Sequence, residues 1–181
     1  MSKLTITVID INDHSPQFSP SNSVTARIRE NMGQGTALTF TTPLRISDLD
    51  EGVNSLFEVN ITGNNAAHFE VVPSTVQSSA DLVVRVTDGS VLDYEFRRSL
   101  SIMLLARETQ TAEKRSSSVV ITVQIEDEND NSPVFDKTSY EVTIQENEPA
   151  RTFVTVVNAT DDDGSMKFSR VTYSLQGAEG L

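Results

Sequence analysis

Closely spaced acidic and amide side chains form a motif that occurs twice in the sequence. Residues 10–18 read DINDHSPQF, and residues 127–135 read DENDNSPVF. Asp and Glu supply charged oxygen ligands and Asn supplies neutral ones, while carboxylates packed this closely repel one another unless a cation neutralises them. Several oxygen ligands of mixed carboxylate and carbonyl type suit Ca²⁺, whereas Mg²⁺ keeps more water and Zn²⁺ prefers His or Cys. The motif therefore predicts a calcium site.

Two further motifs recur in the same order and at nearly the same spacing. Glu30-Asn31 returns as Glu146-Asn147, and the acidic run at 48–51 returns at 161–163. Unrelated acidic clusters would not keep a common order and spacing. The sequence therefore contains an internal repeat.

The elements between these motifs have the pattern of short strands. Apolar residues alternate with polar ones, β-branched residues dominate, and no segment keeps a helical period. About seven strands per repeat predict an all-β fold, a seven-stranded Greek-key β-sandwich repeated in tandem. We expect strands at 4–8, 24–28, 37–41, 57–61, 82–86, 100–106, 119–125, 141–144, 153–158 and 171–175.

The repeat divides the chain into three parts. Residues 1–15 are expected to be the last strand and linker of a preceding repeat, residues 16–130 one complete repeat, and residues 131–181 the first strands of the next. The last part is expected to expose an apolar face, because its sheets cannot close. The acidic motifs then fall at the junctions between repeats.

The overall composition excludes several classes of function. The chain has 26 acidic against 14 basic residues in 181, which disfavours binding to nucleic acid or to an anionic membrane. It has no cysteine, so bound metal is the expected substitute for disulfides, and no apolar run approaches the length of a membrane span. No signal peptide is visible. Two histidines and no phosphate-binding loop give no catalytic constellation, so we do not expect an enzyme.

Together these motifs resemble the cadherin extracellular repeat along nearly the whole chain. The linker motif is intact at 127–133, the entry motif is Glu30-Asn31, and the late motif is 106–108. The remaining two motifs are Leu92-Asp93-Tyr94-Glu95 and the Asp-Xaa-Asp pairs Asp48/Asp50 and Asp161/Asp163.

The resemblance implies three Ca²⁺ ions at an intact junction between repeats. At the second junction it implies as ligands Glu30, Asp93, Glu95, Asp127, the Glu128 carbonyl, Asn129, Asp130, the Asn131 carbonyl, Asp161 and Asp163. At the first junction the implied ligands are Asp10, Asn12, Asp13, Asp48, Asp50, the Asn54 carbonyl and Glu108. The preceding repeat's share is missing there, so the third ion is expected to be the best preserved of the first junction.

Three departures from the family pattern affect these sites. His14 stands where the second linker has Asn131, and Glu108 replaces the usual Asp of the late motif. Residues 164–170 lack the Gly-Xaa-Asn that residues 52–54 keep. His14 and His68 are expected to be surface loop residues rather than ligands.

The resemblance implies calcium-dependent cell–cell adhesion or recognition by the ectodomain of a single-pass plasma-membrane protein. The expected partners are other cadherin ectodomains, in homophilic or heterophilic contacts, and adjacent repeats of the same chain. The alternatives are a passive spacer, a heterophilic ligand-binding segment, a microbial calcium-dependent adhesin, and a carbohydrate-binding sandwich. An EF-hand is rejected because Ser132-Pro133 replaces its glycine, and Asn60 and Asn158 begin glycosylation sequons.

Overall fold

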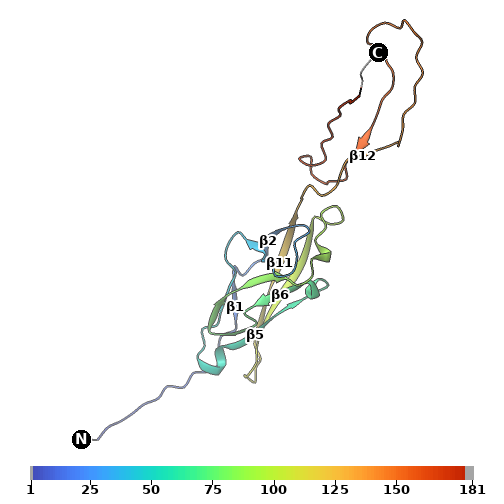
Figure 1. The fold of residues 1–181 in the computed structure, drawn as a ribbon. Coiled ribbons are helices and arrows are strands. Elements are labelled where there is room, and N and C mark those ends of the chain that lie inside the picture. Colours follow the sequence, from blue (N-terminus) through green and yellow to red (C-terminus); the bar gives the residue numbers. More distant parts are fainter. Residues whose placement is uncertain (1, 178–181) are drawn as a thin grey trace. The chain divides into compact units, whose positions relative to one another are not determined.

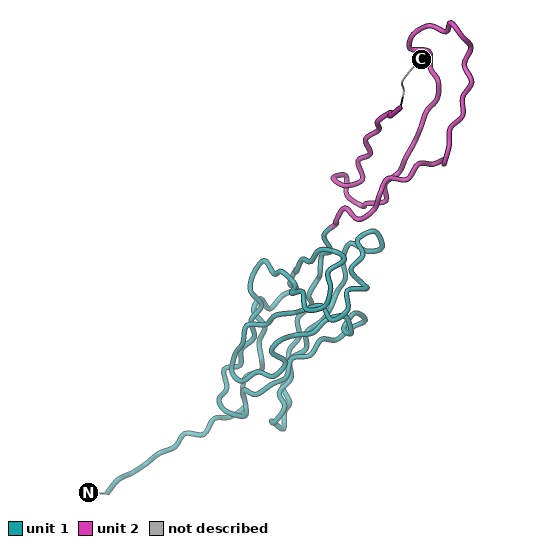
Figure 2. The backbone as a smooth tube through the Cα atoms, in the orientation of Figure 1, with its two compact units in different colours: residues 1–126 teal, residues 127–181 magenta. Residues whose placement is uncertain are grey.

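The computed structural model describes residues 2–177 and divides the chain into two compact units, residues 1–126 and 127–181 (Figure 2). Strands make up most of the regular structure of the first unit (Figure 1). The outermost residues of the first and last predicted parts, residue 1 and residues 178–181, lie outside the described range. Within that range, no helix has the length and apolar character that crossing a membrane requires.

One layer of the first unit is a six-stranded sheet with the order β3-β2-β11-β10-β5-β7. Strand β2 runs parallel to β11, and the other neighbours are antiparallel. Its strands are β2 (Val24–Arg29), β3 (Thr39–Phe40), β5 (Leu56–Thr62), β7 (Thr75–Gln77), β10 (Ser99–Glu108) and β11 (Ser116–Glu126).

The facing layer consists of two smaller sheets, with the orders β1-β4-β8 and β6-β9. Its strands are β1 (Gln17–Ser19), β4 (Arg45–Ser47), β6 (Phe69–Val72), β8 (Ser79–Asp81) and β9 (Val83–Val86). Three short 3₁₀ helices lie in the connections, η1 (Gly52–Ser55), η2 (Ala66–His68) and η3 (Gly89–Val91). The layers form a β-sandwich, as the sequence predicts.

The core follows from the two-residue period of the strands. Alternate residues of β10 and β11 are buried, among them Leu104 and Ile121, which are fully inaccessible. The same alternation buries a carboxylate at one end of β10, Glu108, and another just after β2, Glu30. Because β2 is parallel to β11 and β10 is antiparallel to it, these two carboxylates lie at opposite ends of the sandwich.

The strand predictions for the first unit are confirmed at 24–28, 57–61, 82–86, 100–106 and 119–125, with small differences at the ends. The strand predicted at 37–41 is shorter in the structure, which has only β3 and an isolated bridge at Ala37 in this range. The predicted strand at 4–8 is wrong, because this segment runs free of any sheet and exposes Leu4, Ile6 and Val8. An alternating segment becomes a strand only where another strand pairs with it.

The second unit has two short strands among its described residues, β12 (Val134–Phe135) and β13 (Ala159–Thr160). The strand predictions at 141–144, 153–158 and 171–175 are wrong for the same reason, since these segments have no paired neighbour. Phe135 packs against the rings of Tyr140 and Tyr173. Apolar side chains such as Phe153 are exposed, as expected for this part.

Candidate metal centre

Three segments meet at the Glu108 end of the first unit. They are the linker 10–14 before β1, the turn 48–54 between β4 and β5, and the end of β10. Asn12 Nδ2 donates to Glu108 Oε2 at 2.8 Å, and the His14 N–H donates to Asp50 Oδ2 at 3.1 Å. The structure therefore brings together residues that are up to 96 positions apart in sequence.

Glu108 lies at the centre of this group and is only 1% exposed. Its Oε2 accepts hydrogen bonds from Asn12 Nδ2, from the Thr111 hydroxyl, and from the Arg115 N–H at 3.1 Å. Thr111 and Arg115 lie in the β10–β11 connection outside every motif, so the sequence pattern does not predict their contacts. These donors fix the orientation of the Glu108 carboxylate.

Three buried oxygens of the same group have no hydrogen-bond partner. They are Asn12 Oδ1, Asp48 Oδ2 and Glu108 Oε1. A buried polar atom without a partner costs about 1–3 kcal/mol, and more when the group is charged. One amide oxygen and two carboxylate oxygens are the donor types that Ca²⁺ prefers. The residues at this end of the sandwich therefore fit a bound calcium ion.

The pKa of Asp48 is raised by its burial and by the carboxylates close to it. Burial raises the pKa of Asp48, and the nearby carboxylates of Asp50 and Glu108 raise it further, whereas the hydrogen bond from the Asp50 N–H lowers it. The negative charges therefore oppose one another in the absence of a cation.

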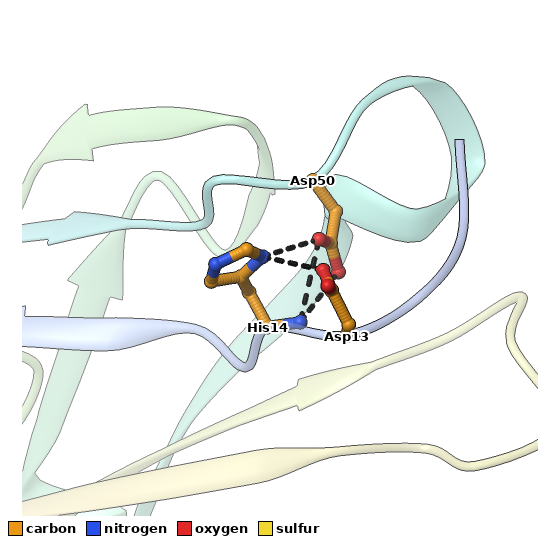
Figure 3. Close-up of side chains that lie close together, drawn as sticks. All are labelled: Asp13, His14 and Asp50. Atoms are coloured by element: carbon orange, nitrogen blue, oxygen red, sulfur yellow. Dashed lines mark hydrogen bonds and ion pairs between the residues drawn. The ribbon is translucent and has the colours of Figure 1, made fainter. Parts of the chain in front are cut away.

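Asp13, His14 and Asp50 form a second cluster beside this group (Figure 3). His14 Nδ1 lies 2.7 Å from Asp50 Oδ1 and 2.8 Å from Asp13 Oδ1. The hydrogen bond with Asp50 is the main cause that raises the pKa of His14. Burial alone would raise the pKa of Asp50, but hydrogen bonds from the ring and the backbone N–H of His14 bring it below its usual range. His14 is on the surface, as expected, but its contacts with two predicted ligands were not foreseen.

Asp10 holds the turn that follows Asp50. Its Oδ2 accepts from the Glu51 N–H at 2.9 Å and from Asn54 Nδ2 at 3.0 Å. Asn54 was predicted to offer its backbone carbonyl, and the structure adds a contact through its side-chain amide.

The same hydrogen bonds recur in the second unit. The Asn131 N–H donates to Asp163 Oδ1 at 2.9 Å, which matches the contact of His14 with Asp50. The Asp163 N–H donates to Asp161 Oδ1 at 3.1 Å, the distance of the equivalent bond in the first unit. The duplicated sequence therefore has a duplicated local geometry.

Asp127 occupies the position of Asp10 in the second copy of the linker motif. Its Oδ2 accepts from the Ser165 N–H at 3.0 Å. Asp163 is buried, and its Oδ2 has no hydrogen-bond partner. An unpartnered carboxylate oxygen is therefore present in this copy as well.

The other predicted ligands are distributed between the two units. In the first unit, Glu30 is buried and its Oε2 accepts from the Tyr94 N–H at 2.8 Å, while Asp93 and Glu95 are exposed. In the second unit, Asp130 Oδ1 accepts from Asn131 Nδ2 at 3.0 Å. Glu128 is half-buried and Asn129 is exposed there.

No protein-family model matches the chain, but the known proteins that it resembles are cadherins or cadherin-related proteins. Cadherin-86C of Drosophila melanogaster is 41% identical over 155 residues, which cover 84% of this chain and 8% of that protein. Human cadherin-related family member 1 is 34% identical over 178 residues, covering 96% of this chain and 20% of that protein. The chain thus spans a small fraction of the length of these relatives.

Solved structures agree with the curated relatives. The extracellular cadherin domains 1–4 of protocadherin gamma B7 have a TM-score of 0.75 at 28% identity, covering 93% of this chain and 39% of that one. Mouse cadherin-23 EC22–24 has a TM-score of 0.70 at 29% identity, covering 94% of this chain and 50% of that one. The protocadherin structure comprises extracellular cadherin domains, and the family to which these relatives belong is not enzymatic. The sequence motifs, the sandwich and the relatives agree, and the chain belongs to the cadherin superfamily as part of a cadherin ectodomain.

Proposed function

We propose that this chain takes part in calcium-dependent cell–cell adhesion or recognition, and that calcium at its repeat junctions stiffens the ectodomain. The observation that carries the proposal is the set of three buried, unpartnered oxygens on Asn12, Asp48 and Glu108. A folded chain that keeps such atoms without hydrogen bonds gains stability from any cation that binds them.

At the first junction, Asn12, Asp48 and Glu108 would hold one ion, with Asp50 and the carbonyls of His14 and Asn54 beside them. Bound calcium would supply the positive charge that these carboxylates lack. The chain's own hydrogen bonds do the positioning, because Thr111 and Arg115 fix Glu108 and the Asp50 N–H fixes Asp48. Asp10 and Asp13 of the linker would serve the other ions of this junction.

At the second junction, we propose a fuller set of ligands. Glu30, Asp93 and Glu95 come from the repeat that precedes the linker. The linker and the following segment supply Asp127, the Glu128 carbonyl, Asn129, Asp130, the Asn131 carbonyl, Asp161 and Asp163. Because more donors are available at the second junction than at the first, we propose that its first two ions bind more tightly than their counterparts at the first junction.

Calorimetric titration of the calcium-free chain tests this proposal. We expect at least two classes of site, with Asp127→Ala removing the tighter class and Asp48→Ala a weaker one. Equal, tight occupancy at both junctions would contradict the unequal affinities, and the absence of calcium binding would refute the proposal as a whole.

Small-angle scattering tests the mechanical part. Without calcium the carboxylates repel one another and the linker is expected to act as a hinge, so a chelator should broaden the distribution of interatomic distances. Glu30→Ala should have the same effect in calcium without unfolding the complete repeat. An unchanged scattering curve on adding chelator would show that calcium does not stiffen this segment.

The proposed partners are other cadherin ectodomains, through a single-pass membrane protein that carries this segment outside the cell. The chain has no Trp, so it lacks the side chain that strand-swapping adhesive repeats of the family use, and a spacer or heterophilic role is an equal candidate. Beads coated with the chain separate these roles: aggregation of the beads in calcium indicates homophilic contact, whereas its absence favours the other two.

A further inference from the structure

The cluster of Asp13, His14 and Asp50 places an imidazole nitrogen between two carboxylates (Figure 3). His14 Nδ1 is within 2.8 Å of an oxygen from each, and all three ligand atoms lie within 4.8 Å of one another. One nitrogen and two oxygens are a donor set that suits Zn²⁺, which often takes three protein ligands and one water. Ca²⁺ prefers oxygen ligands alone.

We propose that Asp13, His14 and Asp50 form a zinc-binding site. A zinc site goes beyond the calcium function proposed above, although the zinc site and the calcium sites would share Asp13 and Asp50. Its distinguishing ligand is His14, which the calcium proposal uses only through the backbone carbonyl.

The burial of the three side chains suits such a site. The Asp50 side chain is 1% exposed and is held by the backbone N–H of His14, so it provides a fixed anchor. The side chains of His14 and Asp13 are 47% and 59% exposed. Tetrahedral zinc with bonds near 2.0 Å separates its ligand atoms by about 3.3 Å. The two contacts of His14 Nδ1, at 2.7 and 2.8 Å, would therefore lengthen by about half an ångström, which the exposed side chains of His14 and Asp13 permit.

The cluster is also accessible from solvent. A surface cavity of about 380 Å³ adjoins it, which gives zinc a route of entry and leaves space for a water as the fourth ligand. The cavity is lined by Asp13, His14, Ser15, Gln17, Ser47 and Leu49.

The second copy of the motif provides an internal comparison. Asn131 occupies the position of His14 and makes the same backbone contact, with Asp163. An amide side chain has no ring nitrogen to offer a transition metal, so zinc selectivity is confined to the first copy. Because zinc and calcium would share two ligands, excess calcium should lower the apparent affinity for zinc, and excess zinc should lower that for calcium.

Titration of the chelator-treated chain with Zn²⁺ alone tests the proposal. We expect one site that His14→Asn weakens by at least about tenfold, the scale of loss when a metal site is disturbed. His68→Asn is the matched control, because His68 Nδ1 contacts a single carboxylate, at 3.0 Å. It should bind Zn²⁺ as the unaltered chain does.

Two further measurements separate this proposal from the calcium function. Zinc should shift the imidazole nitrogen resonances of His14 but not those of His68, and His14→Asn should bind calcium normally. Equal zinc binding by the chain and by His14→Asn, or no zinc binding at all, would overturn the proposal. If the unaltered chain bound zinc but did not bind calcium, only the proposed calcium function would be refuted.

Discussion

Replacing Glu108 with Gln should change stability in opposite directions with and without calcium. Without calcium, Glu108 Oε1 is a buried charged oxygen with no partner. Gln removes the charge, keeps an oxygen for the three existing donors, and brings an N–H₂ group to a region where Asn12 Oδ1 and Asp48 Oδ2 lack donors. Relief of one such penalty is worth about 1–3 kcal/mol, so Glu108→Gln should stabilise the calcium-free chain by up to that amount.

With calcium, the expected sign reverses. An ion present at 1,000 times its dissociation constant stabilises the folded state by about 4.1 kcal/mol. After the relief of about 1–3 kcal/mol is subtracted, loss of that contribution leaves a net destabilisation of about 1–3 kcal/mol, which lowers the melting temperature of a chain of this size by about 2–12 °C. Glu108→Gln should therefore melt below the unaltered chain in calcium and at or above it in chelator.

Thermal unfolding followed by circular dichroism, in excess calcium and in chelator, measures both signs. Glu58→Gln is the matched control, because it makes the same chemical change at an exposed position of β5, and it should differ little in either condition. If Glu108→Gln destabilised the chain equally in both conditions, Glu108 would be a structural residue and not a calcium ligand.

Three further predictions concern the fold itself. Gly89→Ala should destabilise the chain by about 1–3 kcal/mol in urea unfolding, because the new Cβ would lie 2.2 Å from a backbone carbonyl oxygen, whereas Gly33→Ala, with nothing within 4 Å, should be nearly neutral. Leu104→Ala removes a fully buried side chain and should cost about 2–5 kcal/mol by the same assay, so a negligible cost would mean that the core is packed otherwise. Hydrogen bonds from the N–H and hydroxyl of Ser90 lower the pKa of Asp88 below its ordinary value of 3.8. The negative charge of Asp88 therefore stabilises the fold above pH 3.8, and this stabilisation is lost as the pH falls through the lowered pKa. Asp88→Asn should therefore be less stable than the unaltered chain at neutral pH and equal to it in strong acid, and a difference that persisted in acid would contradict the assignment.

The fold of the first unit could be predicted because its strands have a clear two-residue period. Strands β10 and β11 alternate over ten residues or more, and their partners are within the chain. The segments 4–8 and 153–158 have a similar pattern but remain unpaired. Pairing depends on residues far away in sequence, which a local pattern does not report.

The residues of the candidate site that lie close together were predictable in part, but their supporting contacts were not. Asp48, Asp50 and Glu108 were identified by motif, and the structure brings them together with the linker. The support of Glu108 by Thr111 and Arg115 was not predictable, because it depends on how the β10–β11 connection folds back. The contact of His14 with Asp50 was missed because a single histidine in a loop carries no periodic signal.

The placement of Glu108 on the inward face of β10 has a consequence for insertions and deletions. Since side chains alternate between faces, adding or removing one residue of β10 before Leu104 would turn Glu108 outward and move Leu104 out of the core in the same step. A chain with that error would lose its packing as well as the buried carboxylate. Mutations of this kind should therefore prevent the unit from folding, whereas a point substitution of Glu108 would leave the core packing of β10 in place.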